Sequence, residues 1–257
     1  YEIASCLVGS EMCIRDSWEN ATDDLRGAII GAAHPEQNAK EDRTIYVKHG
    51  HYVSPSLNQD GTAFPIHTSN LTSGKQLNLT IKGSCTGIGL GSKAVQNFSQ
   101  PSYIAAHPQM TAQTKQLFDI SVNSGKRLTL EGFSMTNEKP EKEGGTAVKL
   151  TKVAKDGQMA LRQVALRGNR VGIEVGKDAL QEGSKLLAVN TLFADNGTGL
   201  AFDSKDDVSV KNATLVNTTF ANNSVADMSK EVTNTYNSVS WNNKVNNICL
   251  LYTSDAA

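Results

Sequence analysis

The sequence is poor in most of the features by which composition alone defines a protein class. It has four cysteines and six prolines in 257 residues, so a disulfide-rich mini-scaffold is excluded. The hydrophobic share of 39% is too high for a disordered chain. Lys and Arg (25) nearly balance Asp and Glu (26), which argues against nucleic acid as a partner. No run of eighteen apolar residues is present, so the sequence predicts no membrane span.

Both ends of the chain look foreign to the rest of it. When Glu11–Asp16 is back-translated as GAG ATG TGT ATA AGA GAC and followed by AG, the reverse complement, read one base in, encodes Cys-Leu-Leu-Tyr-Thr-Ser. These are residues Cys249–Ser254, so the two ends resemble the paired adapters of a sequencing insert. We therefore expect residues 1–17 and 248–257 to be adapter-derived and non-native, and residues 18–247 to be one domain from a longer protein.

This interpretation changes the charge and the cysteine count of the domain. Residues 18–247 carry 24 basic and 22 acidic side chains, a net charge near +2. Cys85 is the one cysteine left, and a lone cysteine in a β-rich chain is usually a small buried hydrophobe. No disulfide is therefore expected among Cys6, Cys13 and Cys249.

One short helix and many short strands are expected. Thr22 is the expected N-cap of a helix over residues 22–33, which His34-Pro35 ends and whose apolar face holds Leu25, Ala28, Ile29 and Ala32. Downstream, alternation of apolar and polar residues predicts strands. The clearest of them cover residues 43–48, 51–53, 77–83 and 117–122.

An internal repeat organises the second half of the chain. Five blocks align on a terminal asparagine: LTLEGFSMTN, ALRQVALRGN, LAVNTLFADN, TLVNTTFANN and NTYNSVSWNN. The terminal asparagines are Asn137, Asn169, Asn196, Asn223 and Asn243. Six residues before each of them lies another polar residue: Glu131, Gln163, Asn190, Asn217 and Asn237. A second short apolar strand follows the first four blocks, at residues 147–150, 171–175, 199–202 and 225–228.

A repeat of 20–32 residues made only of short strands predicts an all-β, right-handed parallel β-helix of about seven coils. Each coil would lie about 4.8 Å above the last, so that the terminal asparagines stack and hydrogen-bond along the axis. The expected inward columns hold Val164, Leu166, Val189, Leu192, Val216, Phe220 and Val239. The short helix would cap the N-terminal end, where strand edges are otherwise exposed.

The segments IYVKHGHY (45–52), LTIKG (79–83) and NATLVNTTFANN (212–223) resemble right-handed parallel β-helix proteins of the pectate-lyase-like superfamily. The final run of asparagine-rich blocks is most similar to secreted, cell-surface β-helix proteins of bacteria. The resemblance covers residues 40–247, and it implies a coil of three sheets and an extracellular setting. A shared fold does not fix an activity.

Two clusters could carry chemistry in such a fold. Asp203, Asp206 and Asp207 resemble the Asp-Asp element of polygalacturonases, but the accompanying motifs are absent, and a turn between coils is the favoured interpretation. His49 and His51 share the spacing of two metal ligands, but no third ligand is nearby and Gly50 breaks the strand. We therefore predict no metal-binding residue.

Three further patterns also favour a structural interpretation. Arg162, Arg167 and Arg170 could present a lyase-type arginine, but no acidic column accompanies them. The glycine-rich stretch 83–91 is not followed by a helix signal, so no nucleotide loop is expected. Pectin methylesterases share the pattern at 45–52, but their later Asp- and Gln-bearing motifs are missing. The sequence predicts no catalytic residue and no cofactor.

The expected function is that of a secreted or cell-surface β-helix scaffold or adhesion module, non-catalytic and in contact with carbohydrate such as a polysaccharide or surface glycan. The alternative is a fragment of a polysaccharide lyase or glycoside hydrolase that acts on acidic polysaccharide. A third option is a module like a phage tail spike, which would be expected to trimerise. An enzyme should show stacked acidic or arginine columns on one sheet, whereas a scaffold should show Asn, Thr and Ser there.

Overall fold

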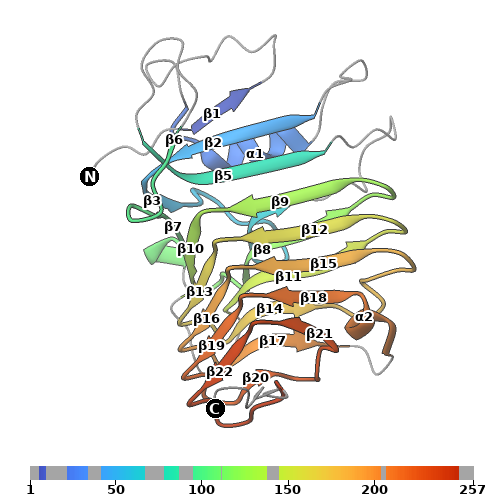
Figure 1. Ribbon diagram of the computed structural model, residues 1–257. Helices are drawn as coiled ribbons and strands as arrows, with labels where there is room; N and C mark the ends of the chain where they lie inside the picture. Colours follow the sequence, from blue (N-terminus) through green and yellow to red (C-terminus); the bar gives the residue numbers. More distant parts are fainter. Residues whose placement is uncertain are drawn as a thin grey trace.

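A computed structural model describes residues 6–9, 22–33, 42–66, 78–86, 95–110, 112–137, 145–203 and 207–248. In these residues three sheets of mainly parallel strands stack coil upon coil along one axis (Figure 1). Viewed from the N-terminal end, the chain runs clockwise from the first sheet to the third as it moves away, so the coil is right-handed (Figure 1). The predicted right-handed parallel β-helix is confirmed.

Each full coil contributes one strand to each sheet, and we name the sheets A, B and C in chain order. Sheet A holds β2 (Arg43–Lys48), β5 (Leu79–Thr86), β9 (Arg127–Glu131), β12 (Gln158–Arg162), β15 (Lys185–Val189), β18 (Ala213–Val216) and β21 (Asn234–Tyr236). Sheet B holds β3 (Gly50–Val53), β7 (Ser102–Ala105), β10 (Phe133–Thr136), β13 (Ala165–Arg167), β16 (Leu192–Ala194), β19 (Thr219–Ala221) and β22 (Val239–Trp241). Sheet C holds β4 (Thr62–Ile66), β8 (Gln116–Val122), β11 (Thr146–Val153), β14 (Val171–Val175), β17 (Thr198–Phe202) and β20 (Ala226–Met228). The described strands therefore form six full coils and the first two strands of a seventh, in agreement with the predicted number of about seven.

The other helices and strands in the described residues are two antiparallel strands and three short helical segments. In sheet A, β1 (Cys6–Gly9) pairs with β2 and β6 (Val95–Gln96) pairs with β5. The segments are α1 (Leu25–Ala33), the 3-10 helix η2 (Pro108–Met110) and α2 (Asp207–Lys211). None of the helices in the described part of the chain is long and apolar enough to cross a membrane.

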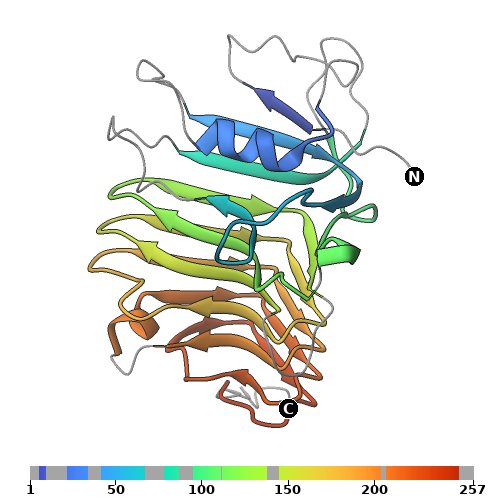
Figure 2. The ribbon, with the colours of Figure 1, turned by 180° about the vertical axis from the view of Figure 1, so that it is seen from behind.

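Helix α1 packs against β2 and β4 at the N-terminal end of the coil, as predicted (Figure 2). Its predicted apolar face is buried, with Leu25, Ala28, Ile29 and Ala32 at most 9% exposed. The predicted N-cap is wrong by two residues. Asp24 caps the helix through Gly27 N–H at 2.8 Å, and Thr22 Oγ1 instead accepts a hydrogen bond from Asp24 N at 3.1 Å. His34-Pro35 lies outside the described residues.

The predicted terminal asparagines form a buried ladder through the whole second half of the coil. Oδ1 of Asn169, Asn196, Asn223 and Asn243 accepts a hydrogen bond from the backbone N–H of the asparagine one coil earlier, at 2.8–3.1 Å. Nδ2 of Asn169, Asn196 and Asn223 also donates to the next Oδ1 in the column. These buried amides therefore satisfy one another and fix the register of neighbouring coils.

The predicted core columns are right only in part. Val164, Leu166 and Phe220 are buried, but Val189, Leu192 and Val216 are half-buried and Val239 is 49% exposed. A left-handed residue between sheets A and B reverses the alternation of sides, which turns Leu192 and Val239 outward. Val189 and Val216 precede this residue and are outward residues of β15 and β18. The column that fills the core instead contains Leu166, Phe193, Phe220 and Ser240.

The predicted second polar column is right at four of its five positions, and these four residues are the left-handed ones. Gln163, Asn190, Asn217 and Asn237 have φ of 52°, 50°, 49° and 48°. In the coil before them the position belongs to Gly132 (φ 74°), and not to Glu131, which ends β9 opposite Arg162. The coil of Asn169 has one more residue, Gly168, between its sheet B strand and its asparagine than the coil of Asn137 has. Aligning the two blocks on these asparagines therefore pairs Gln163 with Glu131, whereas its structural equivalent is Gly132.

The upper end of the asparagine ladder is incomplete, and completing it should stabilise the fold. Asn137 Oδ1 is buried and has no hydrogen-bond partner among the described residues. Register places Ala105 beside Thr136, so Ala106 takes the next place in the ladder. Ala106→Asn is expected to raise the free energy of unfolding by about 1 kcal/mol, because its amide can donate to Asn137 Oδ1. Chemical denaturation measures the change.

The matched control is Ala105→Asn, one residue earlier on the outer face of sheet B, which should leave the free energy of unfolding nearly unchanged. A loss of stability in Ala106→Asn, with Ala105→Asn neutral, would show that the ladder cannot be extended upward.

Candidate functional site

The outer face of sheet B carries a continuous column of side chains through all seven coils. Register places His51, Tyr103, Ser134, Ala165, Leu192, Thr219 and Val239 directly above one another. Six coil steps of about 4.8 Å make this column about 29 Å long. His51 and Tyr103 stack at 4.7 Å with an angle of 11° between the rings. The middle of the column has the small side chains of Ser134 and Ala165, between Tyr103 and Leu192.

The lower end of sheet B ends in exposed apolar groups. Trp241 is 69% exposed and Val239 is 49% exposed. We call the outward residues of the last three coils the sheet B platform, and they are Leu192, Ala194, Thr219, Ala221, Val239 and Trp241. Exposed aromatic and apolar side chains that lie together on one surface mark a candidate binding site.

Exposed amides border the platform on both sides. Asn190, Asn217 and Asn237 lie at the corner with sheet A, and Asn217 Nδ2 donates to Asn190 Oδ1 at 3.1 Å. At the corner with sheet C, Asn242 Nδ2 donates to Asn222 Oδ1 at 2.8 Å. The border residues Asp195, Asn222 and Asn242 also adopt positive φ, of 56°, 54° and 52°. Each exposed amide offers both a donor and an acceptor.

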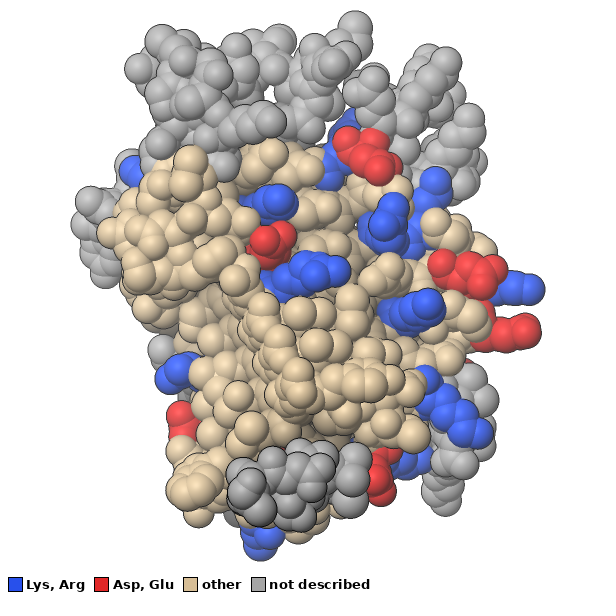
Figure 3. Space-filling model, viewed as in Figure 1, with Lys and Arg blue, Asp and Glu red and all other residues tan. Residues whose placement is uncertain are grey.

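Two exposed charged residues adjoin the platform, Arg167 in register with Ala194 and Asp195 at the corner with sheet C. The surface on the sheet A side carries little charge. On sheet A, the outward Leu187, Val189 and Val216 are half-buried and Tyr236 is 56% exposed. Charged side chains gather over the upper part of the face in Figure 3, whereas the centre of its lower half is almost entirely uncharged. Tyr236 and Trp241 therefore flank the corner at Asn237 in an uncharged surface that continues from one sheet to the next.

The two histidines singled out in the sequence have different neighbours. His49 lies between β2 and β3, and its backbone N–H donates to Cys85 O at 3.0 Å. Gly50 (φ 145°) turns the chain there, and His51 stacks on Tyr103. The described residues contain no group of three or more His, Cys, Asp or Glu side chains arranged to hold a metal ion.

The three arginines lie on different sheets. Arg162 ends β12 in sheet A, Arg167 ends β13 in sheet B, and Arg170 precedes β14 in sheet C. Arg170 pairs with Glu174 at 3.6 Å. Although close in sequence, the three arginines therefore do not form a common site.

The other predicted positions are only partly described. Asp203 is exposed after β17, Asp206 lies outside the described residues, and the chain from Asp207 begins the short helix α2. The structure therefore places a helical turn in part of the segment predicted to be a turn between coils. The start of the glycine-rich stretch lies in β5, and residues 87–94 are outside the described part.

Sheet C holds the strongest grouping of paired charges. Register places Asp119, Lys149 and Glu174 in one column on three successive coils. Glu174 pairs with Lys149 at 3.7 Å and accepts a hydrogen bond from Thr146 at 3.1 Å. Thr151 donates to Asp119. Both carboxylates therefore have partners within the sheet.

Cys85 is a buried structural thiol. It is 0% exposed, and burial raises its pKa to about 11. Because thiolate is the reactive form of cysteine, a thiol with this pKa stays protonated and inert near neutral pH. Cys85 is a free cysteine, as the sequence predicts.

Comparison of the chain with protein-family models, curated proteins and solved structures gives no match. A functional site in this chain is therefore inferred from geometry. Sequence reasoning missed the platform, although Trp241 occupies a block position where the three preceding repeats carry Arg167, Ala194 and Ala221. That departure from the earlier repeats is the signal that could have indicated it.

Proposed function

We propose that this chain is a non-catalytic β-helix scaffold or adhesion module that contacts carbohydrate through the sheet B platform. The observation that carries the proposal is Trp241, an exposed indole at the C-terminal end of the outer face of sheet B. Aromatic faces pack against the apolar face of a sugar ring, while amides hydrogen-bond to its hydroxyl groups. The two amide borders and the central small residues support a neutral glycan chain lying along the axis.

The proposal includes a setting and a family. The three-sheet parallel coil supports placing the chain with the pectate-lyase-like superfamily, and the asparagine-rich blocks favour the secreted, surface-displayed bacterial members. A rigid rod whose face repeats every coil is well suited to a polymer that also repeats. An extracellular or cell-surface location is part of this proposal, because surface glycans are found there.

The alternative is a fragment of an enzyme that cleaves acidic polysaccharide. Asp119 and Glu174 favour it to a limited degree, because two carboxylates two coils apart could flank a glycosidic bond. Their engagement with Thr151 and with Lys149 weighs against free acid and base roles. Release of reducing ends from polygalacturonate that is lost in Glu174→Gln would favour the enzyme.

Affinity gel electrophoresis with neutral polysaccharides tests the platform directly. Trp241→Ala should weaken the affinity for xylan, mannan or β-glucan, read from the gel retardation, by about thirtyfold, because truncating an aromatic anchor of a binding surface often costs about 2 kcal/mol. Val225→Ala is the matched control, since Val225 is a 55% exposed apolar residue that lies just before β20, outside the platform. Retention of full binding in Trp241→Ala, or no retardation of the wild type by any of the three, would contradict the proposal.

A further inference from the structure

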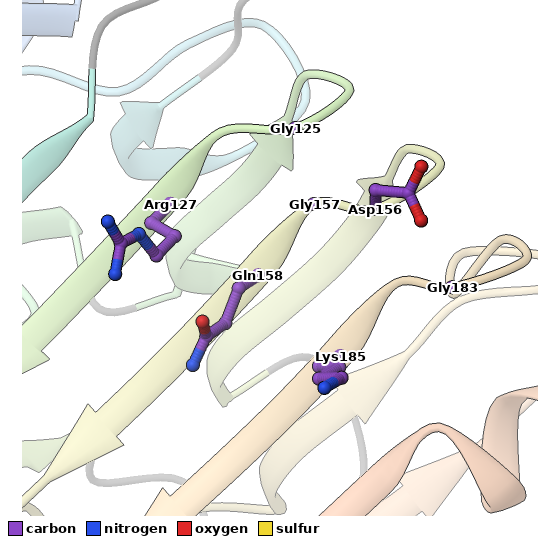
Figure 4. Close-up of a pocket in the computed structure, with 7 residues that line it drawn as sticks. All are labelled: Gly125, Arg127, Asp156, Gly157, Gln158, Gly183 and Lys185. Atoms are coloured by element: carbon purple, nitrogen blue, oxygen red, sulfur yellow. The ribbon is translucent and has the colours of Figure 1, made fainter.

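A second surface feature lies where the strands of sheet A begin, at the corner with sheet C, whereas the platform lies on sheet B. Arg127, Gln158 and Lys185 begin β9, β12 and β15, and register places them directly above one another. They line a depression of about 340 Å³ (Figure 4). The three side chains follow one another at coil steps of about 4.8 Å. The guanidinium, the amide and the ammonium group carry five, two and three N–H donors.

Glycines at the turns create the depression. Gly125, Gly157 and Gly183 lie just before the three column residues on successive coils. Gly125 and Gly183 have φ of 67° and 70°, and a Cβ at Gly157 would lie 2.8 Å from Ala154 O. The absence of a side chain leaves open space at Gly125, whereas the Asp156 carboxylate lies against Gly183.

The positive charges of the column are not neutralised within the described part of the chain. Neither Arg127 nor Lys185 forms an ion pair with a described residue, whereas Lys149 and Arg170 both pair with Glu174. Asp156 is the acidic residue in the lining, and its side chain points away from Arg127 and Gln158 (Figure 4). The depression is therefore lined by donors on one side and has an acid at the opposite rim.

We propose that this depression binds a tetrahedral oxyanion, the phosphate or sulfate group of a free ion or of a sulfated polymer. A guanidinium gives two parallel donors, and the ammonium and the amide add others. These donor groups outnumber the two oxygens of a carboxylate. The three or four oxygens of a tetrahedral oxyanion can accept a hydrogen bond from each of the three side chains. This site is independent of the platform, and the two proposals fail separately.

Isothermal titration with inorganic phosphate and with dextran sulfate at low ionic strength tests the site. Arg127→Gln and Lys185→Gln should each weaken binding about tenfold, because each removes a charge-assisted contact. Arg162→Gln is the matched control, since Arg162 is an exposed arginine on β12 outside the depression, and it should change the affinity less than about twofold. Asp156→Asn should tighten binding about threefold, because it removes a repelling charge.

The two probes distinguish the sources of the oxyanion. If the same variants weaken dextran sulfate binding, the ligand is a group on a polymer, and if they weaken phosphate binding alone, it is a free ion. Equal losses in Arg162→Gln and Arg127→Gln, weaker binding by Asp156→Asn, or no saturable binding of either probe would overturn the proposal. Unchanged oxyanion binding in Trp241→Ala would separate this site from the platform.

Discussion

Asn196→Ala is expected to lower the free energy of unfolding by about 4 kcal/mol, and the melting temperature by about 8–16 °C. Asn196 Oδ1 accepts hydrogen bonds from N and Nδ2 of Asn169, both at 3.0 Å. Its Nδ2 donates to Leu166 O at 2.9 Å and to Asn223 Oδ1 at 3.1 Å. Alanine would leave these buried partners with fewer hydrogen bonds and nothing to replace them. Calorimetry and urea denaturation measure both quantities.

Asn190→Gly is the matched control for this prediction. Asn190 lies in the neighbouring exposed column, and glycine keeps its positive φ of 50° without strain. The substitution removes an exposed hydrogen bond to Asn217, so the free energy of unfolding should change by no more than about 1 kcal/mol. If Asn196→Ala costs no more than Asn190→Gly, the buried ladder is not what holds the coils together.

Gly199→Ala is expected to destabilise the fold by about 3 kcal/mol. A Cβ at this position would lie 2.5 Å from Asp227 O and 2.6 Å from Phe220 Cδ1. Phe220 cannot move aside easily, because it is fully buried and stacks on Phe193 at 4.5 Å with an angle of 3° between the rings. The added methyl group must therefore push apart two coils, which equilibrium denaturation would report.

The same substitution in helix α1 should have the opposite sign. Gly31 is exposed and a Cβ there meets nothing within 4 Å. Gly31→Ala should raise stability by about 1 kcal/mol, because alanine favours the helix more than glycine does. If Gly199→Ala is as well tolerated as Gly31→Ala, the close approach of the coils at this position is not a constraint on the fold.

The fold was predictable because asparagines recur once per coil and so reveal the length of the repeat. Asparagines are uncommon in a protein core, so a buried column of them indicates stacking more clearly than apolar residues can. The direction of individual side chains was harder to predict. Thr191 and Thr218 are buried where an unbroken strand would place Leu192 and Thr219, because Asn190 and Asn217 are left-handed and reverse the alternation.

The candidate sites were not predictable by the same reasoning. The column of Arg127, Gln158 and Lys185 exists only after the strands are registered, since an extra Gly168 makes the asparagine spacing differ from the strand spacing. Of the acids and histidines that are prominent in the sequence, Asp203 follows β17, His49 lies between β2 and β3, and His51 lies in β3. A single sequence shows which residues recur, but it does not show which outward residues share a face.

The platform is tested most directly by the fluorescence of Trp241 itself. The chain has two tryptophans, so Trp18→Phe leaves Trp241 as the sole emitter. Titration with xylohexaose, mannohexaose and cellohexaose should give a saturable blue shift with at least one of them, because a sugar ring would displace water from an indole that is 69% exposed. Calorimetric binding of a hexasaccharide without any change in Trp241 emission, or no binding of any of the three, would contradict the account.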